Sequence, residues 1–443
     1  MTTRDDTHML NREQLVAATG RPLPPMVRTV SLVLIIAGAI TFVAGAVGRG
    51  GQDRVWQALL ANWLFFSALS QAGVVFVAVQ RITTARWSRP VVRLLEGYVA
   101  FLPVSLILLA VLLIGGVHLF PGFAQHIEVA EKRFYLQPGF MAARDLFVVG
   151  LLTSLSCWYI YRSLRLDVGL LPESGASWAR GLRERMRAGF GEERREIHRT
   201  HSMQGRLAVI LCLLFGMGYT VVAWDLSMTL DPHFQSTLYS WWFFMGGWLC
   251  ALTSWSLLTM AWRRYLNAYD LITETHIWDL GKLCFAFTAF WGYLTFGQYL
   301  VIWYGNMGEE THFMHLRLSP PWVGTTLTIV FLVFVIPFFG LLSRAAKVYL
   351  PTFILFASSS LIGMWLLRYI EVYPSLNPTA DTMPLGVWEL GVTLGVLGLW
   401  GFCYSSFMDA FPRVRVALLT SPFRDEVQVP VNPDTMEPLP AHE

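Results

Sequence analysis

The sequence predicts an all-α integral membrane protein with ten transmembrane helices, and three observations lead to this fold class. Of the 443 residues, 54% are hydrophobic and only 14% are charged, whereas soluble globular proteins carry about 25% charged residues. The apolar residues form ten runs, and basic residues gather in every second connection between these runs. A lipid bilayer is therefore the expected solvent for most of the chain.

Each run is bounded by charged residues and is close to the length of about 20 residues that crosses the hydrocarbon. The fourth run is short and is expected to extend past Arg144 and Asp145. The expected spans are 29–48, 55–80, 97–125, 146–161, 207–224, 234–262, 283–308, 319–343, 348–367 and 390–408. Residues 29–408 then form one membrane domain that contains the long loop 162–206, between an N-terminal segment 1–28 and a tail 409–443.

The distribution of Lys and Arg orients the predicted helices. With a cytoplasmic N-terminus, the inside segments hold 26 of the 33 Lys and Arg residues, and loop 162–206 alone has ten arginines. Such a bias is typical of cytoplasmic connections, so we predict a multi-pass protein of the bacterial inner membrane with both termini cytoplasmic. Topology accounts for the basic loops, and no nucleic-acid partner is expected. The Pro-rich stretch after Phe423 is expected to be disordered or to lie on a partner.

A weak internal repeat relates the second and third helices to the sixth and seventh. Trp63 and Trp242 each begin an aromatic run near the outer face, and a basic inner connection follows in both cases. Arg93 and Lys282 then open the next helix. A parallel repeat of this kind predicts two four-helix bundles, helices 2–5 and 6–9, with helices 1 and 10 flanking them. Chance similarity between aromatic helix ends is the alternative.

The cysteines and histidines are not spaced as ligands. The five cysteines lie in apolar stretches, and no two of them form a CxxC pair. CxxC is the spacing found in many metal sites and haem-attachment sites. A membrane cytochrome b needs histidines that face each other across helices, but only His118 of the ten histidines lies in a predicted span. The sequence therefore predicts no metal site, no haem and no covalently bound cofactor.

Ionisable residues near the inner helix ends are the first candidates for function. Glu96 opens the third helix, and His276, Asp279 and Lys282 lead into the seventh. Charged side chains in membrane helices are costly and are functional candidates by default, so we predict that these four belong to a proton path. Asp279 and Lys282 are three residues apart and can pair on one helix face. Anchoring at the membrane interface is the alternative, above all for Lys282.

A second group of acidic and histidine residues lies near the outer helix ends. Its members are His118, Asp145, Asp225, Asp231 and His233. Aspartate and histidine can hydrogen-bond a polar ligand and accept its protons, which makes this group the candidate binding region. For Asp231 and His233 the alternative is structural, a helix end followed by a cap for the sixth helix.

Polar residues follow one face of the seventh helix at intervals of three or four residues. They are Thr288, Trp291, Thr295 and Gln298. Such stripes usually hold membrane helices together through hydrogen bonds. The alternative is a hydrated half-channel, which adds Gln298 to the candidates for the proton path.

Several segments of the second half carry a resemblance to a known family. They are WDLSMTLDPHF at 224–234 with STLY at 236–239, DLGKLCFAF at 279–287, FWGYL at 290–294, QYLVIWYGN at 298–306 and EET at 309–311. In these segments the chain resembles the NrfD/PsrC-like membrane subunits, in particular the ActF-like subunits of alternative complex III. The resemblance covers residues 220–315 with good specificity, while the first half is similar mainly in helix number and loop lengths.

The resemblance implies a membrane subunit of a quinol-oxidising electron-transfer complex, a quinol:cytochrome c oxidoreductase, that is not catalytic alone. It also implies two four-helix bundles with flanking helices. The implied partners are an NrfD-like sister subunit, a periplasmic iron–sulfur protein, multihaem and monohaem cytochrome c subunits and a terminal oxidase. The chain is expected to be a scaffold that contacts menaquinone or ubiquinone at the outer group and offers a proton path.

Two other functions remain open at this point. Ten helices with a repeat would also suit a secondary transporter, but transporters typically have helices broken by Gly or Pro at corresponding midplane positions. Pro103 and Pro337 lie in helices that do not correspond in the repeat. A purely structural subunit of the complex is the other alternative.

Overall fold

The computed structural model describes residues 15, 20–48, 51–124, 132–171, 173–423 and 427. All regular secondary structure within these residues is helical. The Pro-rich stretch after Phe423, for which disorder or a partner contact is predicted, lies outside the described residues except for Val427.

The long helices and the short helical turns between them alternate along the whole described chain. They are α2 (Pro25–Val47), α3 (Gln52–Ile82), α4 (Val92–Glu96), η1 (Gly97–Phe101), α5 (Leu102–Ile114), η2 (Gly116–His118), α6 (Pro121–Ala124), α7 (Pro138–Leu170), η4 (Ser177–Ala179), α8 (Arg180–Arg187), α9 (Glu193–Leu226), η5 (Met228–Leu230), α10 (Thr237–Tyr265), α11 (Glu274–Gly305), α12 (Gly308–Arg317), α13 (Val323–Val330), η6 (Phe331–Val335), α14 (Ile336–Gly340), α15 (Arg344–Val348), α16 (Leu350–Leu376), α17 (Val387–Ala410) and α18 (Val416–Thr420).

Ten helical segments of the described chain are long and apolar enough to cross a membrane, which confirms the predicted number. Three of them are composite, α4–η1–α5, α9–η5 and α13–η6–α14. In the first and the third, the irregular turn comes just before a proline, Pro103 or Pro337. Proline removes a backbone N–H and clashes with the preceding turn, which accounts for both interruptions.

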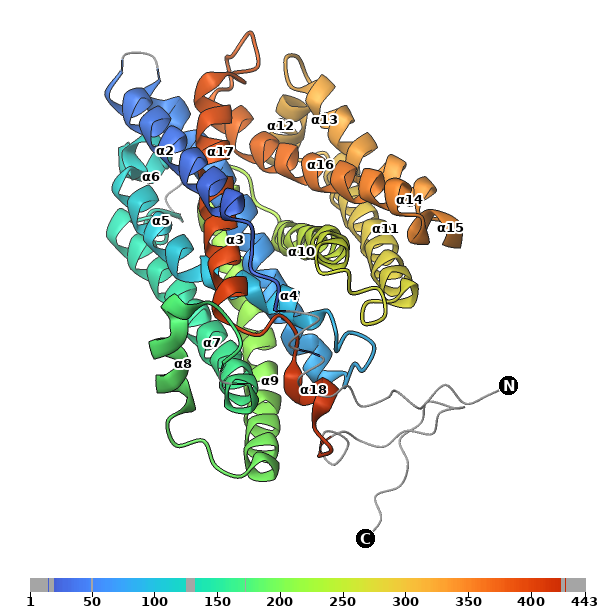
Figure 1. Ribbon diagram of the computed structural model, residues 1–443. Coiled ribbons are helices and arrows are strands. Elements are labelled where there is room, and N and C mark those ends of the chain that lie inside the picture. Colours follow the sequence, from blue (N-terminus) through green and yellow to red (C-terminus); the bar gives the residue numbers. More distant parts are fainter. Residues whose placement is uncertain are drawn as a thin grey trace.

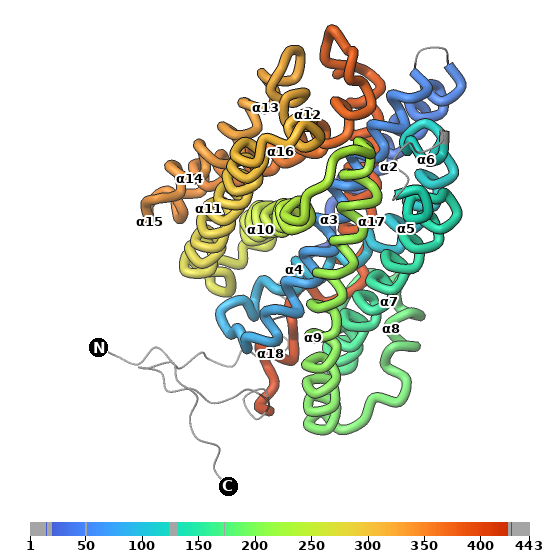
Figure 2. Tube along the Cα trace, turned by 180° about the vertical axis from the view of Figure 1, so that it is seen from behind, coloured from blue at the N-terminus to red at the C-terminus, as the bar shows by residue number. Residues whose placement is uncertain are grey.

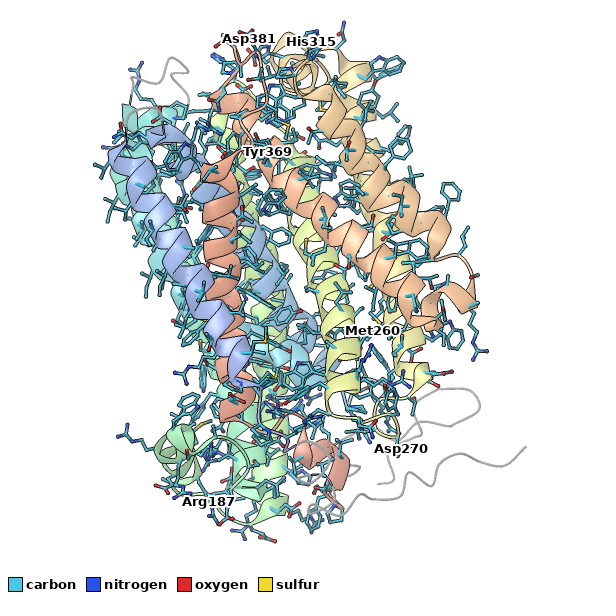
Figure 3. The ribbon with its side chains drawn as sticks, turned by 45° about the horizontal axis from the view of Figure 1, so that its top comes forward. Arg187, Met260, Asp270, His315, Tyr369 and Asp381 are labelled. Atoms are coloured by element: carbon cyan, nitrogen blue, oxygen red, sulfur yellow. The ribbon has the colours of Figure 1, made fainter. Side chains whose placement is uncertain are left out.

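The segments run between two ends of the molecule (Figures 1 and 3). The end that carries α8 and α18 is called the proximal end, and Arg187 and Asp270 mark it in Figure 3. The opposite end, called the distal end, carries α12 and is marked by His315 and Asp381. Connections between consecutive helices therefore alternate between the two ends.

Helix α3 is the centre of the molecule, and α10 lies beside it (Figure 2). Helix α3 packs against α2, α5, α9, α10, α16 and α17, and almost every residue from Ala58 to Ala78 is buried. In contrast, α2, α11 and α13 expose large apolar side chains, for example Val33 and Tyr293. Apolar faces of this kind suit contact with lipid tails or with other membrane subunits.

The flanking helices α2 and α17 pack closely because their glycines meet. A Cβ atom added at Gly38 would lie 2.3 Å from the Cα atom of Gly395, which leaves no room for a larger residue. Small residues let the backbones of membrane helices approach in this way.

Several helices extend beyond the spans expected from the sequence. Helices α7 and α9 continue into 162–206, and α8 occupies much of the remainder of that loop. Helix α16 continues past Leu367 to Leu376. After α17 the chain stays packed, with Val414 and Val416 buried at the proximal end. A charged residue was the expected end of each span, but several charged residues in these extensions are buried, among them Asp167, Arg368 and Glu371.

Candidate functional site

An apolar cavity of about 110 Å³ lies in the distal half of the molecule, between α10, α11, α12, α13 and α16. Aromatic and aliphatic side chains from all five helices form most of its wall. Tyr369, labelled in Figure 3, marks this level of α16. The polar side chains in the wall belong to Tyr239, Thr295, Gln298, Arg317, Thr326 and Glu371. Apolar walls with a few polar groups are typical of ligand sites.

A buried group of charges stands at one side of this distal cavity. Arg368 donates to both carboxylate oxygens of Glu371 at 2.7 Å and to the Phe243 carbonyl oxygen at 2.8 Å. Arg317 donates to the Glu371 backbone carbonyl oxygen at 3.0 Å. Burial lowers the pKa of Arg317 to about 10, and nearby Tyr239, Glu371 and Asp231 act in the opposite direction. Arg317 therefore stays charged at neutral pH, and it is a second buried cation near the carboxylate that pairs with Arg368.

The glycine at position 246 makes this arrangement possible. A Cβ atom at Gly246 would lie 3.1 Å from a guanidinium nitrogen of Arg368. Arg368 thereby lies against α10, with its guanidinium carbon 3.8 Å from the centre of the Phe243 ring. A cation over an aromatic face is stabilised by the ring quadrupole, most strongly where water is excluded.

Ser227 connects Tyr239 and Glu371 behind the cavity wall. The Ser227 and Tyr239 hydroxyl oxygens are 2.6 Å apart, and the Ser227 hydroxyl donates to Glu371 Oε2 at 3.4 Å. Ser227 belongs to the segment 224–234, whose Phe234 ring stacks on Phe313 with 3.8 Å between the ring centres. Segment 224–234 thus forms part of the support of the cavity.

A spare hydrogen-bond donor lies behind the cavity wall, and the cavity opens onto an apolar surface. Trp291 lines the cavity, and its indole nitrogen, which is buried on the side of Gly246, has no hydrogen-bond partner in the described part of the chain. Buried donors normally have partners, so such an atom points to a missing one. Leu318 and Val330 also line the cavity and are 41% and 36% exposed on the outer surface of the helices.

The predicted polar stripe of α11 faces this cavity and α10. Trp291, Thr295 and Gln298 all line the cavity. Trp242 Nε1 donates to the Thr295 hydroxyl at 2.9 Å, and the Gln298 amide nitrogen donates to the Ser236 hydroxyl at 2.9 Å. The stripe therefore joins α11 to α10, as the first of the two alternatives expects, and three of its members lie in the wall of an apolar cavity. A hydrated half-channel, the second alternative, stays a prediction.

Two of the five predicted outer residues meet next to α9. The carboxyl group of Asp145 on α7 interacts with that of Asp225 on α9. Arg144 donates to Asp225 Oδ2 from Nε at 2.7 Å. Both Asp145 carboxyl oxygens and Asp225 Oδ1 are buried and lack hydrogen-bond partners among the described residues. One arginine thus faces two buried carboxyl groups, and a proton held between them would balance the charge.

The other three predicted outer residues lie elsewhere at the distal end. His118 Nδ1 pairs with Asp53 Oδ1 at 2.8 Å, and its ring stacks on Trp56. Asp231 Oδ1 accepts from the His233 backbone N–H at 3.2 Å, and His233 is exposed. This local turn supports the structural alternative for Asp231 and His233.

Glu96 belongs to a compact network of charges at the proximal end. Arg93 forms ion pairs with both Glu96 and Asp167. The Ser163 hydroxyl donates to Glu96 at 3.0 Å, and Arg415 Nε lies 3.6 Å from the same carboxylate. The Ala417 backbone N–H donates to Asp167 at 2.9 Å. The two positive charges of Arg93 and Arg415 balance the two negative charges of Glu96 and Asp167. Each of the four carboxylate oxygens has a hydrogen-bond or ion-pair partner.

His276, Asp279 and Lys282 form a separate group at the start of α11. His276 Nδ1 accepts from the Thr273 backbone N–H at 3.1 Å and so caps the helix. The predicted Asp279–Lys282 pair forms at 2.6 Å, and the Lys282 side chain is half exposed over the Trp278 ring. This geometry supports interface anchoring. The proton-path candidates therefore lie in three places: Glu96 in its network, these three residues, and Gln298 at the distal cavity.

Some charged residues of these sites were not predicted from the sequence, because they lie at or beyond the expected ends of the membrane spans. They are Arg317, Arg368 and Glu371 at the distal cavity and Asp167 and Arg415 in the Glu96 network. Arg368 and Glu371 are three residues apart between apolar residues, and this spacing, which suits an ion pair on one helix face, is the signal that could have found them.

Comparison with models of known protein families finds no match for this chain. Comparison with curated protein sequences finds no match either. Within the described residues, no group of three or more His, Cys, Asp or Glu side chains is placed to hold a metal ion.

Proposed function

We propose that this chain is a membrane subunit of a respiratory quinol-oxidising complex of the alternative complex III type, and that the distal cavity holds the quinone ring. One observation carries the proposal. The distal cavity combines apolar walls, a spare buried donor and a rim that opens onto the apolar surface of the helices. The resemblance of segments 224–234 and 298–306 supports it, because both contribute to the cavity or its support.

The apolar surface of the cavity suits menaquinone or ubiquinone, although their rings need more room than the cavity offers in this structure. An engineered apolar cavity of about 150 Å³ binds benzene, whereas the distal cavity measures about 110 Å³, so in this proposal side chains of the wall move apart when the larger quinone ring enters. The exposed rim residues Leu318 and Val330 offer an isoprenoid tail an apolar path into the bilayer. A water-soluble substrate would gain nothing from such a rim.

The polar groups of the cavity can orient the ring and take its protons. Quinol, when bound, supplies two electrons and two protons. Trp291 Nε1, Arg317 and Gln298 lie behind the almost wholly apolar wall of the cavity, and in this proposal they turn toward the ring oxygens when the ring enters. Tyr239, Ser227 and Glu371 form a hydrogen-bonded chain along which a proton can leave the cavity. In this proposal the electrons pass to the iron–sulfur protein at the distal face.

The arrangement of the helices also supports a scaffold with two four-helix bundles. Helices α3, α5, α7 and α9 pack on one another, as do α10, α11, α13–α14 and α16, and α2 pairs with α17. In our proposal the proximal end, which carries the arginine-rich segment 162–206, faces the cytoplasm of a bacterium. The distal end then faces the periplasm and the cytochrome c subunits, beside the NrfD-like sister subunit and a terminal oxidase.

Filling the distal cavity tests the proposal in the assembled complex. Ile329 is buried in the cavity wall and Leu327, two residues earlier on α13, is 51% exposed. We expect Ile329→Phe to reduce labelling of the chain by an azido-quinone analogue about tenfold, because the larger ring occupies the space. Leu327→Phe, with the same new side chain on the exposed face, is the matched control.

Peptide mapping of the labelled chain gives the second readout. The proposal expects labels on α11, α13 or α16, and unlabelled menaquinone or ubiquinone should compete them away. Equal labelling of Ile329→Phe, Leu327→Phe and the unmodified chain would contradict a quinone site in this cavity, as would labels confined to other helices.

A further inference from the structure

A second hollow, of about 70 Å³, lies at the proximal end and has a basic lining. The end of α3, the connection from Thr84 to Val92, the start of α9 and the segment from Arg415 to Leu418 surround it. Figures 1 and 2 show α18, which lies in this last segment, next to α9 at that end. It is well separated along the helices from the distal cavity, and no residue lines both.

Arginines dominate the charge of this proximal hollow. Arg81, Arg89 and Arg415 line it together with His201. Arg81 donates to the His201 carbonyl oxygen at 2.9 Å, and no carboxylate pairs with it within the described residues. Tyr159 and Arg415 both act on Arg81, and Arg415 carries the same charge. The half-buried guanidinium group of Arg81 therefore has no anion as a partner in the described chain.

Arg415 belongs both to the lining of the hollow and to the Glu96 network. Its Nε atom lies 3.6 Å from Glu96, and its Nη2 atom donates to the Gln204 amide oxygen at 3.2 Å. The two carboxylates of that network balance Arg93 and Arg415 and leave no negative charge for Arg81. The positive charge of Arg81 therefore faces the hollow.

A buried amide completes the lining. Gln80 is 6% exposed, and neither its amide oxygen nor its amide nitrogen has a hydrogen-bond partner in the described chain. Buried side-chain amides are seldom left without any partner. Next to Arg81, its NH2 group is a further donor for an oxygen-rich anion.

We propose that this proximal hollow binds a phosphate group, that of an anionic lipid or of a soluble phosphate compound. Guanidinium groups bind phosphate through charge-assisted hydrogen bonds. Basic pockets between membrane helices at the cytoplasmic side bind acidic lipid headgroups. The site goes beyond the quinone function proposed above and does not depend on it, because it is argued from separate residues at the opposite end.

Binding measurements on the purified full-length chain test the site and identify the source of the phosphate. One arm titrates the chain with phosphatidylglycerol and, separately, phosphatidylcholine and counts retained lipids by native mass spectrometry. The other arm titrates inorganic phosphate and follows thermal unfolding. We expect Arg81→Gln to weaken binding about tenfold, the loss of one charge-assisted hydrogen bond. Arg86→Gln, an exposed arginine of the same connection that does not line the hollow, is the matched control.

A second variant keeps the test decisive if Arg81→Gln does not fold. Gln80→Glu preserves the shape of the lining and adds a negative charge, so it should abolish binding. If these variants lose only phosphatidylglycerol binding, the phosphate group is that of a lipid headgroup. If they lose the binding of inorganic phosphate, it is that of a soluble ligand. Binding that is equal for phosphatidylcholine and phosphatidylglycerol, is unchanged in both variants, or is absent in both arms overturns the proposal.

Discussion

The two ends of the molecule each bury a group of arginines and carboxylates, but the groups are built differently. At the proximal end Arg93 and Arg415 face Glu96 and Asp167, and every carboxylate oxygen has a partner. At the distal end Arg144 faces both Asp145 and Asp225, and three of the four carboxyl oxygens have none.

The difference separates a structural group from one that can handle protons. A balanced and hydrogen-bonded network holds helices in register, and each of its members is needed. A buried pair of carboxyl groups with one cation is balanced only when it holds a proton. The proton chemistry that the sequence assigned to Glu96 is therefore better placed at the distal end, near the proposed quinone cavity.

The largest effect is expected from breaking the balanced network. Arg93→Met leaves Glu96 and Asp167 buried with too little positive charge, and removing one partner of a buried ion pair costs about 3–5 kcal/mol. The free energy of unfolding in detergent should fall by that amount. Arg86→Met, on the exposed side of the preceding connection, should change it by less than about 0.5 kcal/mol. Similar stability of the two variants would show that the network is not needed.

The distal pair should respond unequally to the loss of its two members. Asp225→Asn removes the partner of Arg144 and is expected to cost about 2–3 kcal/mol of unfolding free energy. Asp145→Asn replaces the carboxyl group that holds the shared proton with a neutral amide of the same shape, which can still donate to Asp225, so it should cost less than about 1 kcal/mol. Infrared difference spectroscopy should show a protonated carboxyl band that disappears in Asp145→Asn. If both variants lose the same unfolding free energy and no such band is found, the shared proton is contradicted.

The proposed proton chain can be cut without disturbing the cavity wall. Tyr239→Phe keeps the ring and removes the hydroxyl that bonds to Ser227. We expect kcat for quinol oxidation by the complex to fall about 100-fold, the usual contribution of a positioned proton-transfer group, with little change in KM. Tyr219→Phe, which removes a buried hydroxyl bonded to the Ser67 carbonyl oxygen, should leave kcat near its normal value. If kcat falls equally in both variants, the loss of a buried hydroxyl has disturbed the packing of the helices, and the proton chain is not supported.

The smallest effect is expected at the start of α11. Asp279 and Lys282 form an exposed pair, and such pairs contribute about 0–1 kcal/mol. Asp279→Asn should leave both stability and the rate of quinol oxidation within experimental error. If this variant loses most of the proton movement of the complex, the result supports the proton path that the sequence predicts at the inner helix ends.

The sequence was sufficient for the ten helices because a bilayer imposes a length and a composition on each span. It was poor at locating buried charges for a related reason. Ending a span at the first charged residue placed Arg368 and Glu371 outside the ninth helix, whereas α16 continues to Leu376 and buries both. Asp167 and Arg415 were hidden in the same way, since their burial depends on the return of the C-terminal segment over α7.

The predicted site residues show what local sequence can and cannot give. Asp145 and Asp225 were each found as ionisable residues at a helix end, and the structure brings them together. His118 has the same sequence character but pairs with Asp53 instead. Tertiary packing decides between these outcomes, and the sequence spacing of residues on different helices carries no information about it.

The central claim is that the distal cavity binds the quinone ring, and an electron cryo-microscopy map of the complex in lipid with added menaquinol or ubiquinol tests it most directly. The account predicts density for the ring between α11, α13 and α16, beside Trp291 and Arg317, with the tail leaving past Val330. Density for the ring elsewhere in the complex, with this cavity closed by its own side chains, would contradict it.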